Sequence, residues 1–178
     1  MLLDRIGPAV VLTHSQSGAF GWLIADARPG LVKAIVAIEP AGPPFEATIN
    51  GTGKARAWGI TDVPITYDPP IKDPSEVAVE REAKADGPDL FVCWMQKPPA
   101  RQLVNLKNIP VMVMAAEASY HQVYDHCTAK YLNQAGVKTE YIRLQDRGIR
   151  GNGHMVMIEK NNLDIARVVD EWVQKNVK

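Results

Sequence analysis

Three short stretches of the sequence hold polar residues that can act together in covalent catalysis. The first is HSQSG at residues 14–18, the second is Glu39 in front of a proline, and the third is His154 at the end of GNGH. A serine hydroxyl attacks well only when a base removes its proton, and histidine titrates close enough to neutral pH to be that base. A carboxylate fixes the tautomer of the histidine and stabilises its cation. These residue types therefore indicate a serine nucleophile supported by a histidine and an acid.

The sequence predicts a buried strand directly before each of the first two stretches. Residues 8–13 (PAVVLT) and 33–38 (KAIVAI) are short, mostly apolar runs, which are typical of strands covered on both faces of a parallel sheet. Between them, residues 18–27 have helical spacing of apolar side chains and end before Pro29-Gly30. Because the carboxyl ends of parallel strands meet at one edge of a sheet, the serine cluster and Glu39 are expected to lie close together.

The second half of the chain continues this alternation of strands and helices. It predicts, in order, a buried strand at residues 109–115, an amphipathic helix at 121–134 closed by Gly136, an edge strand at 140–144 and a last helix at 162–176 capped by Asn161 or Asn162. The Gly-rich loop before the last helix carries His154. The alternation predicts an α/β fold with a mostly parallel sheet and flanking helices, and residues 1–178 are interpreted as one domain.

Residues 41–99 differ in character from the rest of the chain. They hold most of the prolines, several glycines and a charged, helical-looking piece around residues 74–84. We interpret this segment as a cap or long-loop insertion over one end of the sheet. Its aromatic residues, among them Trp58 and Trp94, either line a substrate pocket or form a small core of the insertion itself.

Composition excludes several classes of partner. Twenty basic side chains balance twenty acidic ones among 178 residues, so nothing predicts binding to nucleic acid or to an anionic membrane surface. No apolar run reaches the roughly 18 residues that a membrane-spanning helix needs. The first residues do not resemble a signal peptide, because Asp4 and Arg5 interrupt the apolar run. The sequence leaves the compartment open: secreted if an N-terminal segment has been lost, otherwise cytoplasmic.

Two further patterns bear on compartment and metal binding. Cys93 and Cys127 are either free thiols or one disulfide, and Asn50-Gly51-Thr52 is a glycosylation acceptor only in a secreted chain. His121 and His126 stand five residues apart beside Cys127, so they share a helix face poorly as metal ligands. We interpret both histidines as helix-surface residues and predict neither a metal nor a cofactor.

The motifs resemble those of α/β-hydrolases. "THSQSG" resembles the nucleophile elbow of esterases with the pattern (G/S)-H-S-Q-G, and "AIVAIEPAG" resembles a subgroup that takes its acid from the end of the next strand. "GNGHMVMIEKNNLDIARVVDEWV" resembles that subgroup's histidine loop and closing helix. The resemblance implies Ser15 as the nucleophile, Glu39 as the acid, His154 as the base and the Gln16 N–H as an oxyanion donor. His14 becomes a substrate-pocket candidate.

Two rival residues stay open at this stage. Ser17 also has small neighbours and is an alternative nucleophile, although it stands where the family pattern has a second glycine. Glu117 follows the third buried strand, from which most α/β-hydrolases draw their acid, and is the alternative to Glu39. Thr13 departs from the pattern too, because its β-branch occupies a place where a small residue is preferred.

The resemblance also implies a partial α/β-hydrolase fold that lacks the N-terminal strands. The chain begins at the family's fifth strand, so the loop that supplies a second oxyanion donor is expected to be missing, and residues 10–12 are expected to form an open apolar edge. A second chain or a homodimer partner would cover that edge. The leading hypothesis is a cofactor-independent serine hydrolase of carboxylic esters or lactones. The alternatives are a catalytically impaired half-domain that binds a partner chain or ligand, and a lyase or cyclase.

Overall fold

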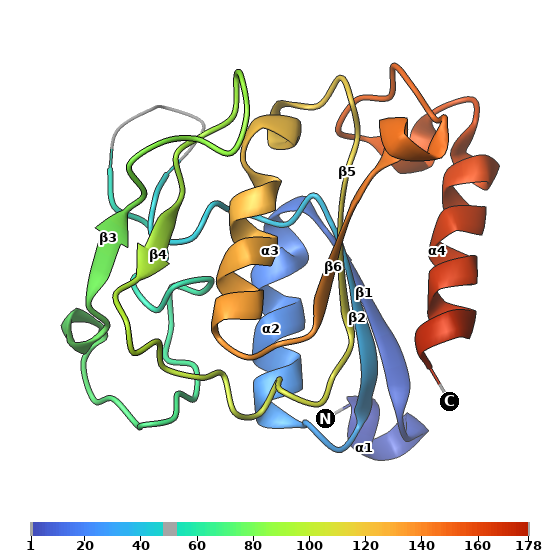
Figure 1. Cartoon of the computed structure of the whole chain (residues 1–178). Helices are drawn as coiled ribbons and strands as arrows, with labels where there is room; N and C mark the ends of the chain where they lie inside the picture. The colour runs from blue at the N-terminus through green and yellow to red at the C-terminus, as the bar shows by residue number, and fades with distance from the viewer. Residues whose placement is uncertain (1, 48–52, 178) are drawn as a thin grey trace.

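A four-stranded parallel sheet forms the centre of the computed structural model, which describes residues 2–47 and 53–177. Its strands lie in the order β1-β2-β5-β6, and each neighbouring pair is parallel (Figure 1). Their bounds are Ala9–His14 (β1), Val32–Ile38 (β2), Val111–Ala115 (β5) and Thr139–Arg143 (β6). The predicted α/β fold with a mostly parallel sheet is confirmed, and within the described residues β6 is an edge strand, as predicted.

Helices cover both faces of this sheet. Helices α2 and α3 lie on one face and α4 on the other, while the short α1 precedes β1 (Figure 1). Their bounds are Leu2–Ile6 (α1), Gly18–Ala27 (α2), Asp125–Gln134 (α3) and Asn162–Asn176 (α4). Alternate residues of β2 enter different cores: Ile35 packs on the side of α2 and α3, and Val36 on the side of α4. The continuous apolar runs of β2 and β5 follow from this two-sided burial. The prediction that residues 8–13 are a buried strand is only partly right, because Thr13 is the one buried residue of β1, which lies at an edge of the described sheet.

Helix α3 is shorter than predicted, because its first residues take another conformation. Tyr120–Val123 form a 3₁₀ turn that Ser119 begins by accepting a hydrogen bond from the His121 N–H, and the α-helix starts only at Asp125. By contrast, α4 has the predicted bounds, although the Asn161 side chain makes no capping hydrogen bond to the helix backbone. Asn161 instead pairs with the side chain of Asn152 in the preceding loop.

The middle segment, residues 41–99, has little regular structure in its described parts, 41–47 and 53–99. Two short strands, Val79–Arg81 (β3) and Trp94–Gln96 (β4), form an antiparallel ribbon on the outer side of α3 (Figure 1). The helical prediction for residues 74–84 is wrong: a single 3₁₀ turn, Pro74–Glu76, is followed by extended backbone and β3. Extended backbone lets the β-branched Val77 enter the core, where it is 6% exposed. Asn50-Gly51-Thr52 lies outside the described residues, and the assignment of 41–99 as a cap stays a prediction.

Strand β1 is the other edge of the sheet within the part of the chain that the structure describes. Leu12 on this strand is 56% exposed. The expectation that another chain covers this edge remains a prediction. None of the helices among the described residues is both long and apolar enough to cross a membrane.

Candidate active site

Ser15 stands at the turn between β1 and α2. Its φ of 57° lies in the left-handed region, where a residue with a side chain is uncommon and strained. Its carbonyl accepts the Ala41 N–H at 2.9 Å, which ties the turn to the segment after β2. Gly18 makes this approach possible, because a Cβ there would lie 2.4 Å from Cβ of Pro40. The turn therefore holds Ser15 close to the end of β2.

The β-branch of Thr13 fits beneath α2 because a glycine faces it. A Cβ at Gly21 would lie 3.1 Å from Thr13 Cγ2, which is tighter than an ordinary contact, and the Thr13 side chain is buried. This departure from the esterase pattern is thus accommodated by the first turns of the helix rather than by the elbow itself.

Glu39 directly follows β2 and is fully buried, with a φ of 45°. Its Oε1 accepts the Ala116 N–H at 2.7 Å, and its Oε2 accepts the Ser119 hydroxyl at 2.7 Å. Oε2 also lies 2.5 Å from Nδ1 of His154. A buried carboxylate loses the hydrogen bonds of water, and these three donors replace them.

His154 joins the acid to the serine. Its Nδ1 faces Glu39, and its Nε2 lies 2.8 Å from Ser15 Oγ. The loop that carries it is held by Glu159, which accepts the Gly153 N–H at 3.0 Å. His14 is also in the site, since its Nε2 lies 2.9 Å from the His154 carbonyl oxygen. The arrangement allows the imidazole to take a proton from the serine hydroxyl while the carboxylate stabilises the resulting cation.

The two rival residues make other contacts. Ser17 Oγ donates to the His14 carbonyl at 2.7 Å and accepts the His14 N–H at 2.9 Å, so it closes a capping box. Glu117 pairs with Arg150 at 2.7 Å and accepts the Gly151 N–H at 3.0 Å. Among the described residues, neither side chain is hydrogen-bonded to His154. This geometry favours Ser15 and Glu39, whose roles stay predictions.

Three other predicted site residues lie in a 3₁₀ turn, in the core and in β4. Gln16 follows Ser15 in the 3₁₀ turn Ser15–Ser17, and its role as an oxyanion donor is untested. Trp58 belongs to the buried core that also contains residues of α2 and α3, and its carbonyl accepts the Tyr67 hydroxyl at 2.9 Å. Trp94 lies in β4 opposite Arg81. A pocket role for either tryptophan remains a prediction.

The turn after β5 brings residues to the site that sequence reasoning missed. Ser119 holds Glu39, and the ring of Tyr120 lies 5.0 Å from that of His154. Partial burial and the charge of Glu39 raise the pKa of the Tyr120 hydroxyl. The sequence offers one indication that Ser119 and Tyr120 belong to the site, which is that they follow the carboxyl end of a buried strand.

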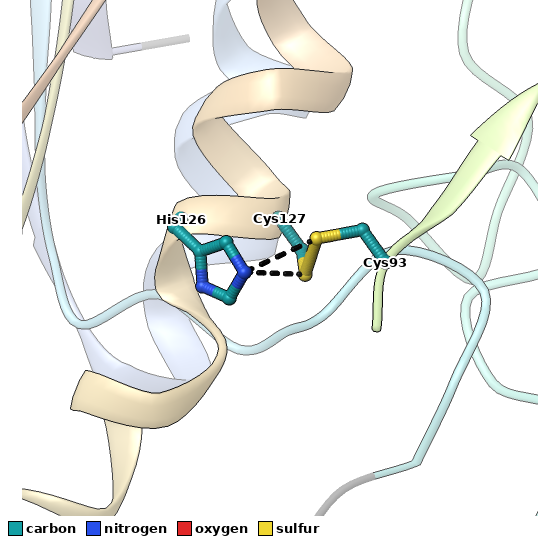
Figure 2. A group of neighbouring side chains, drawn as sticks. All are labelled: Cys93, His126 and Cys127. Atoms are coloured by element: carbon teal, nitrogen blue, oxygen red, sulfur yellow. Dashed lines mark hydrogen bonds between the residues drawn. A yellow bond between two sulfur atoms is a disulfide. The ribbon is translucent and has the colours of Figure 1, made fainter. Parts of the chain in front are cut away.

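The prediction that His121 and His126 are helix-surface residues is wrong. They are 2% and 8% exposed. His121 belongs to the 3₁₀ turn, and its ring stacks on the ring of His154. His126 lies at the start of α3, against the disulfide between Cys93 and Cys127, with Nε2 3.3 and 3.5 Å from the two sulfurs (Figure 2). Because the sulfurs are bonded to each other, they are not the thiolates that bind a metal ion.

No family model matches the chain, but a curated protein and a solved structure are similar to it. The chain is 53% identical over 174 residues to "Probable secreted lipase phiG" from Fungal sp. (strain ATCC 74256), an alignment that covers 98% of this chain and 48% of the relative. The chain thus spans about half the length of the curated relative it matches.

A solved structure, "The Atomic Resolution Structure of a Novel Bacterial Esterase", matches with a TM-score of 0.58 and 23% identity. The match covers 99% of this chain and 41% of the esterase chain. The chain shares the α/β fold of that esterase.

Proposed function

We propose that the chain hydrolyses carboxylic esters or lactones through an acyl-enzyme on Ser15. The observation that carries the proposal is the continuous path from Ser15 Oγ to His154 Nε2 and from His154 Nδ1 to Glu39. The names of the lipase relative and of the structurally similar esterase support ester hydrolysis as the reaction class.

The proposed reaction has two matched steps. Ser15 Oγ attacks the carbonyl carbon of the ester while its proton passes to Nε2 of His154, and Glu39 stabilises the imidazolium. The tetrahedral intermediate collapses, and the departing alcohol takes the proton from Nε2. A water molecule then repeats the sequence on the acyl-enzyme, releasing the acid and restoring Ser15. The N–H of Gln16 is proposed to donate to the oxyanion in both steps.

Hydrolysis of p-nitrophenyl esters with acyl chains of increasing length tests this function. We expect Ser15→Ala to lower kcat/KM by at least about 10³-fold, because the covalent route is lost. Ser17→Ala is the matched control and should stay within a few-fold of wild type. Ester hydrolysis that survives Ser15→Ala but not His154→Ala would overturn the acyl-enzyme and leave His154 as an acid/base that acts without a serine nucleophile.

We also propose that the chain works in an oxidising compartment outside the cell. The Cys93–Cys127 disulfide supports this, since such bonds persist in secreted proteins, and the relative is named a secreted lipase. Thiol alkylation of the protein as first isolated tests the proposal. No modification before reduction is expected, and two reactive thiols would contradict it.

A further inference from the structure

We propose that His121 is a positioning residue for His154, held in place by Asp125. The proposal rests on the proposed function, because it assigns His154 as the base. It adds a second histidine–carboxylate pair whose work is to hold the first imidazole in its reactive orientation.

The rings of His121 and His154 stack face to face. Their centroids are 4.7 Å apart and their planes differ by 3°, which is a stacked arrangement. His14 and Tyr120 also contact the His154 ring, but at interplanar angles of 35° and 48°. A ring stacked face to face limits rotation of its neighbour about the Cβ–Cγ bond, and this rotation would carry Nε2 away from Ser15.

His121 is itself fixed by a buried partner. Its Nδ1 lies 3.1 Å from Oδ1 of Asp125, which stands at the start of α3 and is fully buried. Two residues before His121, Ser119 donates its hydroxyl to Glu39. A single turn therefore contacts the acid through Ser119 and the base through His121, which couples the orientations of both.

The surroundings of His121 favour the neutral form of its ring. Burial, together with His154 and His14, lowers the pKa of His121 to about 3. Burial and the nearby Glu39 raise the pKa of Asp125. His121 thus stays neutral at the pH at which His154 receives the serine proton, and a second cation stacked on that ring would oppose the transfer.

Two substitutions of His121 test whether its flat ring is the property that positions His154. His121→Ala removes the stacked ring, and we expect kcat on a p-nitrophenyl ester to fall between about 10- and 100-fold with KM unchanged, as for small misplacements of a reacting group. His121→Phe keeps a flat ring and should recover most of kcat. His126→Gln is the matched control, because His126 is buried beside the disulfide and should leave kcat within a few-fold of wild type.

A spectroscopic measurement tests the same proposal without relying on turnover. The proton between His154 Nδ1 and Glu39 should give a far-downfield NMR resonance in wild type. We expect that signal to be lost or broadened in His121→Ala and kept in His121→Phe and His126→Gln. An unchanged signal with unchanged kcat in His121→Ala would overturn the proposal. If wild type itself shows no hydrolysis, the proposed function fails, while the resonance still decides whether His121 positions His154.

Discussion

Two histidine–carboxylate pairs lie side by side in this protein, and they differ in how the carboxylate is solvated. Both Glu39 and Asp125 are fully buried and face Nδ1 of a histidine. Three hydrogen-bond donors surround Glu39, whereas Oδ2 of Asp125 has no hydrogen-bond partner among the described residues. A buried charge is tolerated where donors replace water, so the first pair is suited to stabilise a cation and the second to remain neutral.

The pairs also differ in what the imidazole faces. His154 presents Nε2 to a serine hydroxyl, and its side chain is 18% exposed. His121 lies beneath it with a side chain only 3% exposed. Residue types alone therefore do not define the chemistry of a histidine–carboxylate pair, because the donors around the acid and the access to the base decide it.

The largest expected effect separates the two acids. Glu39→Gln should lower kcat by about 10²- to 10⁴-fold, because the amide cannot stabilise the imidazolium and favours the wrong tautomer of His154. Asp125→Asn should cost less than about 10-fold, because an amide can still hydrogen-bond to His121. Ester hydrolysis by the purified variants measures both. Equal losses of kcat in the two variants would show that the two pairs act as one unit and would contradict the difference in role between Glu39 and Asp125.

The disulfide tests whether the second pair depends on the middle segment. Cys127 lies two residues after Asp125, and Cys93 is 34 residues away in the chain, next to β4. Closing a loop of that length stabilises a fold by roughly 3 to 4 kcal/mol, so reduction should lower the free energy of unfolding by about that amount. The downfield resonance of His154 should persist in the reduced protein while it remains folded. Loss of the resonance before unfolding would place the disulfide in control of the site.

The smallest effect concerns the pH dependence of stability. Because the folded pKa of His121 is lowered from 6.5 to about 3, its contribution is fully present above pH 6.5 and is lost as pH falls toward 3. Because the folded pKa of Asp125 is raised, its contribution is fully present below 3.8 and is lost as pH rises. Between about pH 4 and 6.5 the two slopes oppose each other in wild type.

Asp125→Asn should uncover the slope of His121 alone. From pH 6 to 4 the unfolding free energy of the variant, compared with wild type, should fall by up to about 1.4 kcal/mol per pH unit. Urea unfolding at a series of pH values measures this difference. Parallel curves for the two proteins would show that Asp125 and His121 do not form the neutral pair described above.

Elements with a strong sequence pattern were predicted closely. Residues 18–27 and 162–176 are helices with the predicted bounds, because each has apolar side chains on one face and a local start or stop signal. Ser15 and Glu39 could be placed near one another because parallel strands deliver their ends to a common edge, and His154 joined them through the resemblance of its loop to the histidine loop of esterases. The sequence therefore predicted the sheet, and Glu39 and His154 are in contact as expected, while their catalytic roles stay predictions.

The second pair could not be predicted, because it depends on a long-range contact and on a local choice between helix types. His121 and Asp125 are four residues apart whether the segment is one continuous helix or a 3₁₀ turn followed by a helix. The continuous helix that the sequence predicts would place both residues on its surface. Only the packing of that turn against His154 shows that they face inward. Periodicity likewise gave no sign that Val77 would enter the core on extended backbone rather than on a helix.

The most direct test of the central claim is to treat the folded chain with a fluorophosphonate and locate the adduct by peptide mass spectrometry. An adduct on Ser15 that disappears in His154→Ala and is greatly slowed in Glu39→Gln is the predicted result. An adduct on Ser17, or no adduct in a sample that unfolds cooperatively, would contradict the account of Ser15, His154 and Glu39 as one catalytic unit.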